Sequence, residues 1–409
     1  MSIDLKTYES LAAESDCVEK IITPGMAEAV FSCNDHTTSV LQKKWSDNLR
    51  KNIGLYKKHG SFIDAFLGFG KNKAVIGVGA GPSFNKNKNV LKEIYEINLL
   101  QKFEDQPFLI WASNKQLRPL LKMGVYPHFT LLIDAGDALL PQFKIPKWGR
   151  KDSILVAGLH TSPTILNHWD KQGGKICFYL IGEDDDKKFF EDETGEDASK
   201  LHIQQGGNVL NTMWILAQQV LWSTVFMAVG NDLSFPYTHD REAREKGFYA
   251  DGDYRLNILN KRDEAKDNFA WMGFDLYESE LMQGKYLYNL GVVGMSRQLW
   301  VYKVWLEIQA AIWAEKTNFF IYNCSEAGVS GVLAHSYDPK DILEKSNWFL
   351  IDEILPKRWL TTSLYKAARQ FLEAKKCLTQ TATGYAANGV VVLPGKTGFV
   401  KPIVLPKSA

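Results

Sequence analysis

The sequence lacks an excess of charge of either sign. Its 48 lysines and arginines almost balance its 47 aspartates and glutamates, which leaves a formal net charge of +1 over 409 residues. Duplex DNA and anionic membranes are bound largely through clustered positive charge. We therefore expect neither to be a partner of this chain.

Cysteine and long apolar runs are also scarce. The five cysteines are dispersed and include no C-x-x-C pair, which is typical of a reducing compartment and gives no zinc-finger spacing. No apolar run approaches the length of a membrane span, and residues 1–9 contain no signal-peptide core. No H-E-x-x-H motif and no readable Ser/His/Asp arrangement points to hydrolysis. We expect a cytoplasmic protein.

Helical and strand-like segments divide the chain into regions. Apolar residues at Trp45, Leu49, Ile53 and Tyr56 share one face of a helix, so residues 1–70 are predicted as a helical lead-in. From residue 73, apolar segments of strand length alternate with helical segments. The predicted strands are 74–78, 108–112, 129–133, 154–157, 176–181, 225–229 and 319–322. This alternation predicts a doubly wound, mostly parallel, Rossmann-like α/β sheet in a domain at 71–335.

Three further segments lie outside the predicted sheet. Residues 236–291 are charged, aromatic and poorly periodic, and we interpret them as a lid or insertion over the site. The acidic run at 182–197 is interpreted as a solvated loop, although paired carboxylates could hold a divalent cation. Helical patterns at 341–355 and 362–374, followed by a β-like tail from 389, predict a helical appendix at 336–409.

A glycine-rich turn, Gly79-Ala-Gly-Pro-Ser-Phe84, follows the first predicted strand and precedes a helix. This arrangement can aim backbone N–H groups and a helix N-terminus at a phosphate. Phe84 occupies the place of the third glycine in G-x-G-x-x-G, and no P-loop lysine follows. The same glycines would also serve as ordinary punctuation between a strand and a helix.

Small, amide or acidic residues follow five of the predicted strands. Because carboxyl ends of parallel strands form one edge of a sheet, these residues predict a shared ligand crevice. A second Gly-Gly-Asn turn opens the helix near residue 209, where a capped core helix is the alternative interpretation. His239, a few residues past Asp232, is a candidate base. The candidate site residues are Gly79, Gly81, Pro82, Ser83, Asn114, Asp134, Asp137, Gly207, Asn208, Asp232, His239, Asn323 and Glu326.

The ordered motifs resemble the 6-hydroxymethylpterin diphosphokinase MptE-like domain family, in its branch of bacterial motility-associated factors. The turn at Gly79 is similar to the family's Gly-x-Gly-Pro-Ser-Leu. Three further parts of this sequence are similar to motifs of the family. They are Gly124-Val-Tyr-Pro-His-Phe-Thr-Leu-Leu-Ile-Asp134, Gly206-Gly-Asn-Val209 with Val229-Gly-Asn-Asp-Leu-Ser-Phe235, and Asn323-Cys-Ser-Glu-Ala-Gly-Val329. The resemblance covers roughly residues 40–335. His128, Phe84 and Ala327 depart from the family's Asp, Leu and Gly.

The resemblance implies a nucleotide-dependent transferase. The favoured activity is a glycosyltransferase with a nucleotide-activated sugar as donor, such as a CMP-activated nonulosonic acid. Its acceptor would be a glycan, a protein or a small molecule. In that activity Gly79, Gly81 and Ser83 would hold the phosphate, Asn114 and Asp134 the ribose or base, and Gly207 and Asn208 the nucleotide. Asp232 or His239 would act as the base.

Two alternatives stay open. A pyrophosphokinase would use ATP with Mg²⁺ held by Asp134, Asp137 or Asp232, and only this activity would require the metal. A non-catalytic nucleotide-binding module is the other alternative, which the departures at His128 and Ala327 would permit.

Overall fold

The computed structural model describes residues 24–81, 83–145, 153–203, 205–236, 268–278, 286–296, 299, 301–303, 305–306, 309, 320–325, 327–328, 347–350, 359–382, 390–391 and 403–404. The helices among them are α3 (Pro24–His59), α4 (Phe62–Phe66), α5 (Phe84–Leu99), α6 (Asn114–Lys122), α7 (Pro163–Lys171), α8 (Asp184–Thr194), α9 (Val209–Gln219) and α14 (Leu364–Ala382). Short 3₁₀ turns are η1 (Phe103–Asp105), η2 (Asp137–Phe143) and η4 (Ala198–Lys200).

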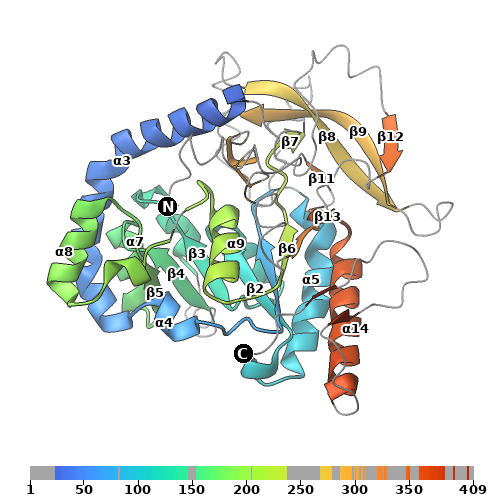
Figure 1. Ribbon diagram of the computed structural model, residues 1–409, viewed down its shortest axis with the longest axis horizontal. Coiled ribbons are helices and arrows are strands. Elements are labelled where there is room, and N and C mark those ends of the chain that lie inside the picture. Colours follow the sequence, from blue (N-terminus) through green and yellow to red (C-terminus); the bar gives the residue numbers. More distant parts are fainter. Residues whose placement is uncertain are drawn as a thin grey trace.

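An eight-stranded sheet forms the centre of the molecule (Figure 1). Its strands are β1 (Ala74–Val78), β2 (Phe108–Ser113), β3 (Phe129–Leu132), β4 (Ile154–Gly158), β5 (Ile176–Tyr179), β6 (Val225–Val229), β10 (Phe320–Asn323) and β13 (Trp359–Thr361). They run in the order β13-β10-β6-β1-β2-β3-β4-β5, and every neighbouring pair is parallel. All seven predicted strands are present, which confirms the doubly wound α/β fold.

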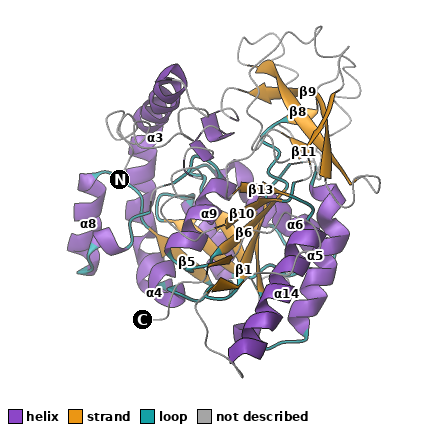
Figure 2. Ribbon diagram, turned by 45° about the vertical axis from the view of Figure 1, so that its right-hand side comes forward, coloured by secondary structure: helices purple, strands orange, loops and turns teal. Residues whose placement is uncertain are grey.

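Helices cover both faces of this sheet (Figure 2). The apolar residues of β1 alternate between two cores, with Val75 in one and Ala74, Ile76 and Val78 in the other. Helices α4 and α9 pack on the first face, whereas α5 and α14 pack on the second. Near the β5 edge, the second face packs against α6, α7 and α8, and the long helix α3 runs past them. Burial on both faces explains why the strands are continuous apolar runs.

A second sheet, which is antiparallel, lies beyond the carboxyl ends of the strands of the eight-stranded sheet (Figure 1). Its members are β7 (Phe235–Pro236), β8 (Asn268–Glu278), β9 (Tyr286–Ser296), β11 (Ala327–Gly328) and β12 (Asn347–Leu350). Strand β7 follows β6 and strand β11 follows β10, so this sheet grows from the carboxyl ends of two central strands. A pair of short strands, β14 (Val390–Val391) and β15 (Ile403–Val404), forms a third sheet.

Two local predictions differ from the structure. The acidic run is not a loop, because α8 contains most of it. The three aspartates in the first turn of α8 stabilise it through the helix dipole, and its Phe190 side chain is buried. The predicted helix at 341–355 is wrong where it is described, since β12 pairs with β9 there. The poorly periodic segment at 236–291 contains β8 and part of β9, which pair as a regular hairpin. Its action as a lid stays a prediction.

Residues past 335 also contribute to the main sheet. Strand β13 pairs with β10, and α14 packs against α5 and β6. Helix α14 falls where the pattern at 362–374 predicts a helix. No helix among the described residues combines the length and apolarity that a membrane crossing requires.

Candidate functional site

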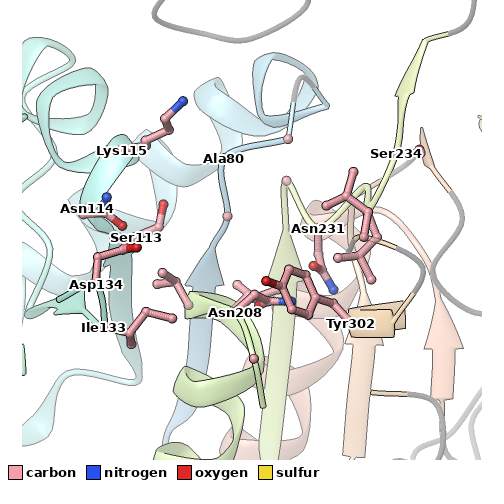
Figure 3. Close-up of a pocket in the computed structure, with 18 of the residues that line it drawn as sticks. Ala80, Ser113, Asn114, Lys115, Ile133, Asp134, Asn208, Asn231, Ser234 and Tyr302 are labelled. Carbon is pink, nitrogen blue, oxygen red and sulfur yellow. The ribbon is translucent and has the colours of Figure 1, made fainter. Parts of the chain in front are cut away.

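A cavity of about 370 Å³ opens at the carboxyl ends of β1, β2, β3 and β6 (Figure 3). After β1, the chain builds β2 to β5 on one side of the sheet and then returns to place β6 on the other side of β1. Strand order therefore reverses between β1 and β6, and open α/β sheets bind ligands at such a reversal. The described lining residues are Gly79, Ala80, Gly81, Ser113, Asn114, Lys115, Ile133, Asp134, Leu139, Gly207, Asn208, Val209, Leu210, Gly230, Asn231, Leu233, Ser234, Leu299 and Tyr302.

The glycine turn after β1 is shaped by its contact with the loop after β6. Gly79 N–H donates to the Val229 carbonyl at 2.7 Å, and Gly81 N–H donates to the Gly230 carbonyl at 2.8 Å. A Cβ on Gly79 would lie 2.5 Å from the Gly230 oxygen, so only glycine permits this approach. These glycines join the two central strands, and the amides of Gly79 and Gly81 are engaged inside the protein.

Asp232 closes the N-terminus of α5. Its carboxylate accepts the Ser83 N–H at 3.0 Å and the Ser83 hydroxyl, and both side chains are buried. A Cβ on Gly81 would lie 2.6 Å from the Asp232 carboxyl carbon. The carboxylate thus occupies the position that the sequence predicts for a phosphate, because a helix N-terminus attracts either anion. Neither Ser83 nor Asp232 lines the cavity.

Backbone strain accompanies this contact. Leu233, which lines the cavity directly after Asp232, has a φ of 50°, a left-handed conformation that leucine rarely adopts. The Ser234 hydroxyl donates to the Asp232 carbonyl at 3.1 Å, and the Ser325 hydroxyl accepts the Asn231 N–H at 2.8 Å. Hydrogen bonds on both sides therefore hold the strained loop against the cavity.

Two other helices have N-termini at the cavity that are open in the sense that no acidic side chain lies in their first turns. Helix α9 begins after Gly207, whose φ is 78°, and Asn208 caps it by accepting the Asn211 N–H at 2.9 Å. The Asn208 amide nitrogen is buried and has no partner among the described residues. Helix α6 begins at Asn114 after Ser113, which makes no capping bond. The first turns of both helices contain no acidic residue, so their positive ends face the cavity.

Polar side chains lie on two sides of the cavity (Figure 3). Ser113, Asn114 and Lys115 come from the β2–α6 junction, where the buried Ser113 hydroxyl also has no partner among the described residues. The Asn114 amide donates to Gln142 Oε1 at 2.7 Å. Asn208 and Asn231 face them from the α9 and β6 sides. Buried donors without partners are costly unless a ligand accepts from them.

Asp134 lies on a loop that is fixed by three consecutive carbonyl contacts. His160 Nε2 lies 3.1 Å from the Ile133 carbonyl, Ser162 N–H donates to the Asp134 carbonyl at 3.1 Å, and the Asn48 amide donates to the Ala135 carbonyl at 3.1 Å. Burial lowers the pKa of His160 to about 3, so the ring is neutral near pH 7 and its Nε2–H donates to Ile133. The exposed Asp134 carboxylate therefore projects from a rigid support.

Two of the three aspartates predicted as possible Mg²⁺ ligands, Asp134 and Asp137, face different cavities. Asp134 lines the cavity at the switch point, whereas Asp137 accepts a hydrogen bond from the Ser162 hydroxyl and lines a second hollow. Among the described residues, no group of three or more His, Cys, Asp or Glu side chains is arranged to hold a metal ion. These residues do not fit the predicted magnesium site.

Asn323 does not line the cavity, and three other predicted residues are not among those that the structure describes. Asn323 is buried at the end of β10, where its side chain accepts the Ser325 N–H at 3.2 Å. Pro82, His239 and Glu326 lie outside the described residues. The cavity does contain predicted residues from four segments, namely Gly79, Gly81, Asn114, Asp134, Gly207 and Asn208.

Sequence reasoning missed Lys115, Asn231 and Tyr302 as lining residues. Lys115 was detectable, because it directly follows the polar strand end Ser113-Asn114. Asn231 directly precedes Asp232 in the same strand end, and no local signal separates the two residues. Tyr302 follows none of the predicted strands, and only the tertiary structure brings it to the cavity.

A protein family and a solved structure are each similar to part of this chain. Residues 46–238 match the family model of 6-hydroxymethylpterin diphosphokinase MptE-like proteins. This part of the chain is similar to MptE-like domains. It contains β1 to β6, α9 and most of the residues that line the cavity. The predicted family is therefore confirmed for the part of the chain that builds the site.

A solved structure of a MAf glycosyltransferase from Magnetospirillum magneticum AMB-1 is also similar to the chain. The two share 15% sequence identity over 68% of this chain and 36% of that one, with a TM-score of 0.43. The chain thus corresponds to little more than a third of the length of that enzyme. No curated protein matches the sequence.

Proposed function

We propose that this chain is a nucleotide-dependent transferase whose donor is a nucleotide-activated sugar. One observation carries the proposal: the open N-termini of α6 and α9 face the same cavity, at the switch point of a domain that is similar to MptE-like domains. Two positive helix ends favour an anion, and a nucleotide phosphate is the anion that such sheets bind at this place. The names of the matched family and of the similar solved enzyme both describe transferases.

The phosphate would lie between the two helix ends and away from the Gly79 turn. Lys115 supplies positive charge from the first turn of α6, while Ser113 Oγ and Asn208 Nδ2 are donors without partners among the described residues. Fixed donors around a leaving phosphate stabilise the charge that develops as its bond breaks. The ends of α6 and α9 would thus both bind the donor and activate its leaving group.

Asp134 is the acidic residue in the described lining of the cavity, and we assign it as the base. An acceptor hydroxyl would attack the sugar's anomeric carbon as the bond from that carbon to the phosphate oxygen breaks. The electron pair leaves with the phosphate, and the hydroxyl proton passes to the Asp134 carboxylate. Asp232 is unsuited to this step because its carboxylate oxygens bind Ser83.

A thermal-shift series with CMP, UDP and ATP, each with and without Mg²⁺, tests the donor class. We expect CMP or UDP to raise the Tm without metal. The Lys115→Gln substitution should weaken binding of that nucleotide about tenfold, because one charged contact is lost. Lys122→Gln, at the other end of α6, is the matched control and should bind normally. Absence of any nucleotide-dependent shift would refute the proposal, and a shift that needs both ATP and Mg²⁺ would favour a pyrophosphokinase.

The role of Asp134 is tested by Asp134→Asn. We expect this variant to bind the nucleotide that stabilises the parent and to lose release of sugar from the corresponding nucleotide sugar, measured by chromatography. Asp192→Asn removes an exposed carboxylate on α8 that lines neither the cavity nor the second hollow, and it should keep the activity. Equal activities of the two variants would exclude Asp134 as the base.

A further inference from the structure

A second hollow of about 550 Å³ lies behind the loop that carries Asp134. Helix α3 forms one wall, and the start of α7 with the loop after β3 forms the other. Successive residues of this loop face opposite ways: Ile133 and Asp134 line the nucleotide cavity, whereas Ala135 and Asp137 line the hollow. The two spaces therefore share one partition.

Positive charge dominates the helical wall of this hollow. Lys43, Lys44 and Lys51 line it from α3, and all three side chains are exposed. None of them forms an ion pair with a described residue. Lys44 also reaches the partition, since a Cβ on Gly136 would lie 3.7 Å from its Nζ. Three unpaired ammonium groups around one hollow attract an anionic group.

The two aspartates at the hollow do not fully balance the charge of the three lysines. Asp137 accepts a hydrogen bond from the Ser162 hydroxyl and so is directed to the N-terminus of α7. Asp47 lies on α3 between the lysines. The described lining thus contains three lysines against two aspartates, one of which is engaged by the protein itself.

The partition is rigid enough to separate two ligands. The Asn48 side chain, which is 5% exposed, donates to the carbonyls of Ala135 and His160 at 3.1 and 3.0 Å. These bonds tie α3 to the partition and to the end of β4. A group bound in the hollow would consequently lie at a fixed place relative to the Asp134 carboxylate.

We infer that the hollow is the acceptor-side site, and that it binds an acceptor carrying a phosphate or carboxylate group. This inference rests on the proposed function, because the nucleotide cavity must hold the donor for the hollow to hold the acceptor. The lysines would bind the acceptor's anionic group, while the rest of the acceptor extends over the solvent-exposed edge of the partition, so that its hydroxyl meets the sugar beside Asp134. Binding of the anion itself depends only on α3 and the loop after β3.

Lysine labelling of the intact chain tests the site residue by residue. The protein is acetylated briefly at constant ionic strength in inorganic phosphate, in citrate or in chloride, and each lysine is quantified by mass spectrometry. At an anion concentration of about twice Kd about two thirds of the sites are filled, so Lys43, Lys44 and Lys51 should react about threefold more slowly. Phosphate and citrate together show whether phosphate or carboxylate is preferred.

Lys88, Lys92 and Lys102 are internal controls, because they are exposed and lie on or after α5, away from the hollow. Equal protection of both sets, or of neither, would overturn the anion site. In calorimetry the Lys43→Gln, Lys44→Gln, Lys51→Gln variant should bind one phosphate fewer than the parent, whereas the Lys88→Gln, Lys92→Gln, Lys102→Gln variant should bind as many as the parent. The Lys115 label, measured with CMP or UDP, reports separately on the donor cavity. Selective protection of the hollow without any nucleotide binding would leave an anion site and refute its role as acceptor site.

Discussion

Replacement of Asp232 by asparagine distinguishes a structural role for this carboxylate from a catalytic one. In the structure the carboxylate accepts two hydrogen bonds from Ser83 and lies at the N-terminus of α5, with 3% of the residue exposed. The side chain therefore joins the turn after β1 to the loop after β6. A catalytic base would instead need access to a substrate.

The expected magnitude follows from these contacts. Asparagine keeps the shape but makes neutral bonds, each about 1 kcal/mol weaker than the charge-assisted bond it replaces. Loss of the negative charge at the helix N-terminus costs about another 0.5 kcal/mol. Asp232→Asn should therefore lower the free energy of unfolding by about 2–3 kcal/mol. Asp232→Ala should cost about 4 kcal/mol, because it also leaves two buried Ser83 donors unsatisfied.

Urea unfolding followed by tryptophan fluorescence measures these differences. A double-mutant cycle with Ser83→Ala should give a coupling energy of about 1–2 kcal/mol, since the two residues contact each other directly. A free energy of unfolding for Asp232→Asn within about 0.5 kcal/mol of the parent value would refute the reasoning, because a neutral surface substitution has an effect of that size. That result, combined with lost sugar transfer, would return Asp232 to the role of base.

Three further predictions concern the support of the loop that carries Asp134 and the start of α9. Gly158→Ala should destabilise the protein by about 2 kcal/mol in the same urea assay, because its Cβ would lie 2.1 Å from His160 Cε1; an unchanged stability would show that the ring can move freely. Because the pKa of His160 falls from 6.5 to about 3 on burial, its contribution to stability is complete above pH 6.5 and declines toward pH 3. The free energy of unfolding should therefore rise with pH between pH 5 and 7, and this rise should be smaller by up to about 1.4 kcal/mol per pH unit in His160→Gln than in the parent. Equal slopes in the two proteins would contradict this prediction. Asn208→Ala should lower the free energy of unfolding by about 1 kcal/mol through loss of the cap on α9 and should also reduce the nucleotide-induced Tm shift; loss of stability alone would remove Asn208 from the ligand site.

Local sequence was enough to predict much of the architecture. The seven predicted strands are continuous apolar runs because both faces of the sheet are buried, and that pattern is visible without any partner. The helices near Asn114 and Val209 are likewise marked by their polar starts. Where local signals conflict the sequence misleads: the acidic residues of α8 suggest a loop, although in a first turn they favour a helix.

The sequence also determined which residues could belong to the site. The polar strand ends of β1, β2 and β3 predict a crevice because parallel strands share one edge, and Gly79, Asn114 and Asp134 do meet there. Which of their groups face a ligand was decided only by the tertiary structure. Ser83 and Asp232 are 149 residues apart, and their contact exists because β6 returns to lie beside β1.

That return changes the interpretation of the glycine turn. From the sequence it predicts a phosphate site, whereas in the fold its amides bind the β6 loop and its helix end binds a carboxylate. The helix ends that stay open are those of α6 and α9, and no local pattern distinguishes an open helix end from a closed one. The sequence specified the strands and their polar ends. Long-range pairing selected the groups that remain free to bind, because hydrogen bonds between distant segments are fixed only when the chain has folded.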